Sequence, residues 1–70
     1  MVSGKYYYYD KRNKSIVEVI YTDNMIEQYE FRVVIGENKG HRGYGCGFIT
    51  LINSGLIILG SLKVLKVLYV

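Results

Sequence analysis

A glycine-rich segment in the middle of the chain carries the clearest chemical signal. Residues 36–47 read GENKGHRGYGCG and hold five of the eight glycines. Because glycine has no Cβ, the backbone N–H groups of a tight turn can approach an anion closely. Arg42, Gly43, Tyr44 and Gly45 combine a basic side chain with closely spaced glycines, so the segment is either a phosphate-binding loop or a flexible glycine loop between sheet elements. The segment lacks the Gly-Lys-Ser/Thr ending of a Walker loop and the three-glycine fingerprint of dinucleotide-binding proteins.

Three other side chains could take part in chemistry. Glu30 could accept a proton from an amine through water, or it could be a solvated or arginine-paired strand residue, because it shares a strand face with Arg32. His41 is expected to be a polar loop residue, and Cys46 a small buried one. One histidine and one cysteine do not make a zinc site, so we expect no metal.

Composition limits the class of protein. The 70 residues are half hydrophobic and allow one domain, whose small core would benefit from a partner or from unusually good packing. The net charge of +3 is lower than that of typical nucleic-acid-binding chains, so nucleic acid is not expected as the main partner. The lone Cys46 and the lack of an apolar leader at the N-terminus predict a cytoplasmic protein.

The elements that would position these residues follow from residue type and periodicity. Residues 5–9 and 15–21 predict a hairpin joined by a polar turn at 10–14. A turn at Thr22-Asp23-Asn24 precedes a third strand, from Tyr29 to Gly36, in which apolar and polar residues alternate.

The last third of the chain allows more than one interpretation. Residues 48–59 fit either a helix or a hairpin that turns at Asn53-Ser54-Gly55, and the β-rich residues 62–70 predict a final strand. A membrane segment over 48–70 is a third possibility. Its uncharged run, residues 48–62, is shorter than the ~20 residues of a spanning helix, so we expect no membrane partner.

The order of these segments suggests a family. The sequence EFRVVIGENKGHRGYGCGFITLIN, followed by LGSLKVLKVLYV, resembles the GNAT superfamily of acyl-CoA N-acyltransferases, and most closely its branch that modifies ribosomal proteins. The resemblance implies an α+β fold with a mostly antiparallel sheet. Its elements would be the hairpin, a central strand from Glu30 to Gly36, a glycine loop from His41 to Gly45, a helix from Phe48 to Leu59 and a splayed strand from Leu62 to Val70.

The resemblance also implies a function. Acetyl-CoA would be the co-substrate for acetyl transfer to an amine, with its pyrophosphate on Arg42, Gly43, Tyr44 and Gly45. The backbone N–H of Val34 or Ile35 would point at the thioester oxygen, and Glu30 would be the catalytic carboxylate.

The resemblance covers only part of the family's fold. Residues 1–70 would be a single partial domain, the acyl-CoA-binding half, without the region that holds the family's tyrosine general acid. Tyr69 is not assigned that role, and we expect the isolated chain to be incomplete as an enzyme. The family motif opens with Arg or Gln, and that position falls on Gly40.

A non-enzymatic alternative stays open. A small all-β module could bind a protein or a single-stranded nucleic acid, using the tyrosines of residues 6–9 and the basic residues near them. In both hypotheses, exposed sheet edges would favour self-association.

Overall fold

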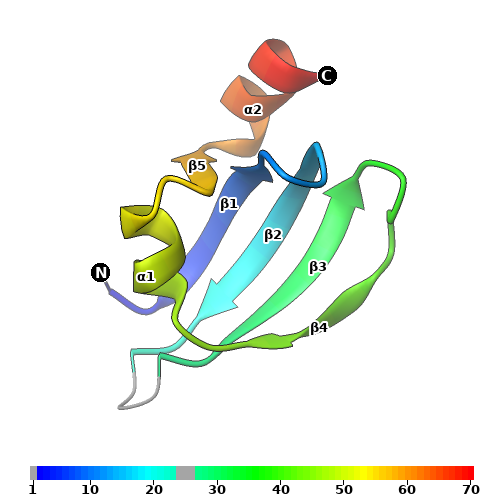
Figure 1. Ribbon diagram of the computed structural model, residues 1–70. Coiled ribbons are helices and arrows are strands. Elements are labelled where there is room, and N and C mark those ends of the chain that lie inside the picture. The colour runs from blue at the N-terminus through cyan, green and yellow to red at the C-terminus, as the bar shows by residue number, and fades with distance from the viewer. Residues whose placement is uncertain (1, 24–26) are drawn as a thin grey trace.

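The computed structural model describes residues 2–23 and 27–70, which form an antiparallel sheet of five strands and two short helices (Figure 1). The elements in chain order are β1 (Gly4–Asp10), β2 (Ser15–Tyr21), β3 (Tyr29–Ile35), β4 (Arg42–Gly45), α1 (Phe48–Asn53), β5 (Ile57–Gly60) and α2 (Leu62–Tyr69). The strands are ordered β4-β3-β2-β1-β5 across the sheet. Among the described residues, no helix is both long and apolar enough to cross a membrane.

The hairpin predicted from the first 21 residues is confirmed. Strands β1 and β2 pair from Gly4 opposite Tyr21 to Asp10 opposite Ser15. The Asp10 carboxylate stabilises the turn between them, because it accepts hydrogen bonds from the Arg12 N–H and from the Asn13 side chain, both at 2.9 Å. Aspartate commonly closes a turn in this way.

The third predicted strand is also confirmed, as β3, but it is not the central strand. Strand β2 lies in the middle of the sheet, and β3 lies between β2 and β4. The turn predicted at Thr22-Asp23-Asn24 lies partly outside the described residues.

One face of the sheet forms the main core. Alternate residues of β2 and β3 point to this face, where Val17, Val19 and Val33 are buried. Helix α1 covers the face with Phe48, which is fully buried. Four tyrosine rings surround that side chain at centroid distances of 5.1–6.4 Å: Tyr6, Tyr8, Tyr21 and Tyr29.

The glycine loop expected at His41–Gly45 is a strand instead. Residues Arg42–Gly45 form β4 and pair with β3, with Gly43 opposite Phe31 and Gly45 opposite Tyr29. Glycine is normally unfavourable within a strand. Here the rings of Phe31 and Tyr29 on β3 lie over Gly43 and Gly45 and fill the space that side chains would take. The glycines therefore make room for aromatic rings.

The helix expected over residues 48–59 is shorter than predicted. Helix α1 ends at Asn53, and Gly55 adopts a left-handed conformation with φ of 74° directly after it. The chain then returns as β5, which pairs with β1 at the edge of the sheet. Because a helix forms at Phe48–Asn53, the all-β architecture with a hairpin at residues 53–55 is wrong.

The splayed strand expected at Leu62–Val70 is also wrong, because these residues form helix α2. Ser61 precedes the helix, and its Oγ accepts a hydrogen bond from the Val64 N–H at 3.2 Å, as an N-cap residue does. Helix α2 packs against β1 and β2 on the side of the sheet opposite Phe48. There Leu65 is buried and the Tyr69 ring stacks on Tyr9 at 3.9 Å.

Candidate functional site

On the face of the sheet opposite Phe48, α2 packs against β1 and β2 with the Tyr69 ring on Tyr9, and most of the side chains farther along the strands are polar. The strand register places these residues in two rows that cross β1, β2, β3 and β4. The first row consists of Tyr7, Glu18, Arg32 and Arg42. The second row consists of Lys5, Ile20, Glu30 and Tyr44. We call this surface the open face.

A shallow hollow of about 330 Å³ lies on the open face, over β2, β3 and β4. Its walls are Glu18, Ile20, Glu30, Phe31, Arg32, Arg42, Gly43 and Tyr44. Both acidic and basic groups face it, together with one exposed aromatic ring, so it could hold a ligand with a charged part and a flat part.

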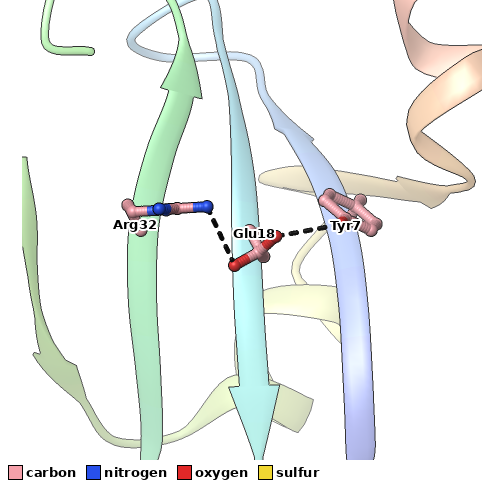
Figure 2. A network of polar contacts seen from close by, with 3 residues as sticks. All are labelled: Tyr7, Glu18 and Arg32. Atoms are coloured by element: carbon pink, nitrogen blue, oxygen red, sulfur yellow. Dashed lines mark hydrogen bonds and ion pairs between the residues drawn. The ribbon is translucent and has the colours of Figure 1, made fainter. Parts of the chain in front are cut away.

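Glu18 bonds to both of its neighbours in the first row, Tyr7 and Arg32 (Figure 2). The Tyr7 hydroxyl donates a hydrogen bond to Glu18 Oε2 at 2.9 Å, and Arg32 Nη2 donates to Glu18 Oε1 at 3.4 Å. The pKa of Tyr7 is raised above its usual value of 10.0, chiefly because the neutral hydroxyl donates to Glu18. Both carboxylate oxygens are thus engaged, and the side chain is only 16% exposed.

Arg32 and Arg42 lie directly opposite each other on β3 and β4. Like charges in such a pair repel, since the Cβ atoms of cross-strand neighbours are only about 5 Å apart. Arg32 is partly neutralised by Glu18, and this is the only ion pair within residues 2–23 and 27–70. The positive charge of Arg42 is therefore free to attract an anion.

The neighbouring pair on these strands is Glu30 and Tyr44. The Tyr44 side chain is 79% exposed, and no other ring of the described chain contacts it. Glu30 is also exposed, and it does not form the ion pair with Arg32 that the sequence allowed. A flat ligand could therefore reach the face of Tyr44.

The structure brings together four of the residues predicted for the site and separates the others. Glu30, Arg42, Gly43 and Tyr44 all line the hollow. Val34, Ile35 and Gly45 do not. Ile35 lies opposite Ile16, near the irregular end of the β2–β3 pair, and Gly45 lies beneath the Tyr29 ring.

The backbone amides expected to converge on a phosphate are used within the β3–β4 connection. Lys39 N–H donates to Gly36 O at 3.2 Å, and Gly40 N–H to Val33 O at 2.9 Å. His41 N–H donates to Asn38 O, also at 2.9 Å. Residues Arg42–Gly45, which were predicted to hold the phosphate, pair with β3 as strand β4 in place of a loop.

Sequence reasoning did not predict that Glu18, Ile20 and Arg32 line the site. The alternation within the third strand correctly placed Glu30 and Arg32 on a shared face. The register between strands was needed to bring this pair beside Glu18 and Ile20, and the segment 42–45 was not predicted as a strand.

The two remaining candidates, His41 and Cys46, do not line the hollow. His41 is exposed, and its ring lies 5.9 Å from that of Phe31. Cys46 is a free and exposed thiol, so the expectation that it is buried is wrong. Nowhere in residues 2–23 or 27–70 do histidine, cysteine and carboxylate side chains gather in a group that could hold a metal ion.

No protein-family model matches the sequence, and no curated protein or solved structure is similar to it at a significant level.

Proposed function

We propose that the chain is a non-enzymatic binding module that holds single-stranded nucleic acid on the open face of its sheet. The observation that carries this proposal is the Arg32–Arg42 pair beside the exposed ring of Tyr44. This local arrangement leads to a different conclusion from the low net charge, from which nucleic acid was not expected as the main partner. The two halves of a nucleotide, a phosphate and a base, match these two features.

The phosphate would lie between the two guanidinium groups. An anion there would relieve the repulsion between Arg32 and Arg42, which Glu18 offsets on one side only. Arginine suits this role because its planar donors can hold two phosphate oxygens at once.

The base would stack on Tyr44. Proteins that bind single strands commonly place aromatic side chains on an exposed sheet surface, and each stacked base is worth roughly 1–3 kcal/mol. At 79% exposure the Tyr44 ring is open to such stacking.

The volume of the hollow fits a small ligand or one nucleotide of a longer strand. Its 330 Å³ is at the low end of the ~300–1,000 Å³ usual for ligand pockets, which suits one nucleotide of a longer strand better than a whole acyl-CoA. Binding of acetyl-CoA with acetyl transfer to an amine, and kinship with the GNAT superfamily, stay predictions. The structure lacks the loop geometry that motivated them.

Two finer assignments accompany this proposal. The helices follow the four-strand segment of the chain and lie outside the sheet, which supports an α+β class. A cytoplasmic location, expected from the lone cysteine, also stays a prediction.

The experiment is a titration of the protein with a fluorescently labelled single-stranded oligonucleotide, followed by anisotropy. With about two phosphates neutralised, we expect a dissociation constant of roughly 10⁻⁴ to 10⁻⁶ M and a slope of log K against log salt of about −1.4. In a parallel NMR titration, the amides of residues 42–45 should shift.

Single-residue variants, each with a matched control, test which side chains bind the oligonucleotide. Tyr44→Ala should weaken binding by about 5- to 150-fold, whereas Tyr44→Phe should keep most of it, because stacking needs only the ring. Arg42→Ala should reduce the salt slope by about 0.7. Arg12→Ala removes the same charge from the β1–β2 turn, away from the hollow, and serves as the control.

Three outcomes would overturn the proposal. The first is the absence of any oligonucleotide binding at millimolar concentration. The second is an equal loss of affinity for Arg12→Ala and Arg42→Ala. The third is acetyl-CoA binding at the same residues more tightly than the oligonucleotide, which would favour the acyl-CoA hypothesis instead.

A further inference from the structure

Helix α2 is apolar on its outer side as well as on the side that contacts the sheet. Leu65 and Tyr69 face the sheet, where Leu65 is 1% exposed. Val64, Val67 and Leu68 recur at helical spacing on the outer side and are 50%, 77% and 63% exposed. A surface helix of a soluble domain normally carries polar residues there, so this outer stripe is expected to be covered by something.

The charges near the stripe are all positive. Lys63 and Lys66 are exposed on α2, and no acidic residue occurs anywhere in residues 38–70. Lys63 lies one helical turn before Val67, so one lysine borders the apolar stripe directly. The surface that covers α2 should therefore be both apolar and negatively charged.

The small size of the stripe argues against a pair of α2 helices from two copies of the chain. A helix of eight residues is about 12 Å long, and stable protein interfaces bury about 800 Å² on each partner. The three side chains of the stripe cannot supply that area. A lipid surface has no such requirement, because each side chain can insert among the acyl chains on its own.

We propose that the outer side of α2 docks onto an anionic lipid surface. Val64, Val67 and Leu68 would enter the boundary between headgroups and acyl chains, and Lys63 would extend to the lipid phosphates and carboxylates. From the short uncharged run we expected no membrane partner, and the exposure of this stripe leads to the different conclusion. The proposal uses no residue of the open face and is independent of nucleic-acid binding.

The test is sedimentation of the full chain with lipid vesicles. Vesicles of phosphatidylcholine with about one-third phosphatidylserine should bind the protein about fivefold more tightly than pure phosphatidylcholine, since one lysine near an anionic surface contributes about that much. High salt should reduce this difference, because it screens the charge of Lys63.

Two variants separate the contributions. Lys63→Gln should remove the preference for anionic vesicles. Val67→Ser/Leu68→Ser should abolish binding to both kinds of vesicle, while circular dichroism shows that the fold is kept. The controls change the same residue types elsewhere: Lys11→Gln for charge, and Val2→Ser, which is 75% exposed in the wild type, for apolar surface.

Analytical ultracentrifugation tests the alternative, in which a second copy of the chain covers the stripe. If the protein forms a dimer that Val67→Ser/Leu68→Ser dissociates, and it does not bind vesicles, a second copy covers the stripe and the proposal is overturned. Binding to vesicles that the control variants weaken as much as the α2 variants would also overturn it.

Discussion

Gly45 lies directly opposite Tyr29 in the β3–β4 pair, and the Tyr29 ring occupies the space that a side chain at position 45 would need. A Cβ on Gly45 would lie 2.5 Å from Tyr29 Cζ and 2.6 Å from its hydroxyl oxygen. The ring has little freedom to move, because it is buried and packs on Phe48 at a centroid distance of 5.1 Å. Glycine at this position is therefore required by packing.

Gly45→Ala should accordingly destabilise the protein, whereas Gly43→Ala should be milder. Overpacking of this kind typically costs about 1–3 kcal/mol of the free energy of unfolding. At Gly43 the new Cβ would lie 3.1 Å from Phe31 Cζ, and Phe31 is only half-buried and can shift. Urea denaturation followed by circular dichroism measures both, and equal losses for the two variants would contradict the packing role.

Phe48 should be the most sensitive position of the core. It is fully buried and surrounded by tyrosine rings, so Phe48→Ala should cost about 3–5 kcal/mol. A single core in a chain of this size rarely supplies more than about 3–5 kcal/mol of stability, so this variant should be largely unfolded. Phe48→Leu keeps most of the volume and should stay folded. The dispersion of amide signals in NMR spectra distinguishes these outcomes, and a well-dispersed Phe48→Ala spectrum would contradict them.

Buried tyrosines should make the fold sensitive to alkaline pH. Burial is the main cause that raises the pKa of Tyr8 and of Tyr29 above the usual 10.0. In the unfolded chain these hydroxyls lose their protons near pH 10. In the folded protein they keep their protons to higher pH. Their contribution to stability is thus complete below about pH 10 and is lost as pH rises toward the raised pKa values.

The free energy of unfolding should therefore fall steadily above about pH 10. Urea denaturation at a series of pH values measures this, and phenolate absorbance reports which tyrosines titrate. Tyr8→Phe removes one of the groups and should flatten the decline. A stability that does not change between neutral pH and pH values above 10 would show that these hydroxyls are not protected by the fold.

The parts of the fold that could be predicted from the sequence are those set by local signals. The β1–β2 hairpin has strand-forming residues on both sides of a turn that Asp10 closes, so neighbours in sequence determine it. Strand β4 could not be predicted in this way, because its glycines favour a strand only when Phe31 and Tyr29 lie over them.

Helix α2 was missed for a different reason. Its valines and leucines suggested a strand, although Ser61 is a good N-cap residue and was present in the sequence. The candidate site was partly predicted: Glu30, Arg42, Gly43 and Tyr44 do meet in one hollow. They meet because of the β3–β4 register, which no single segment encodes.

The two carboxylates of the open face should differ in their effect on oligonucleotide binding. Glu30 is exposed, has no ion-pair partner among the described residues and lies directly opposite Tyr44. Glu30→Gln removes a negative charge beside the proposed phosphate position, so it should strengthen binding by about two- to fivefold and leave stability within about 0.5 kcal/mol of the wild type.

Glu18→Gln should mainly lower the stability of the fold. The Glu18 carboxylate accepts hydrogen bonds from both Tyr7 and Arg32, and replacing the charge weakens both, at a cost of about 1 kcal/mol. Anisotropy titrations at several salt concentrations and urea denaturation separate the two effects. If Glu30→Gln leaves affinity unchanged while Arg42→Ala lowers it, the phosphate lies nearer β4 than the hollow suggests. If Glu30→Gln instead lowers affinity, the carboxylate itself contacts the ligand, because removing a repulsive charge cannot weaken the binding of an anion.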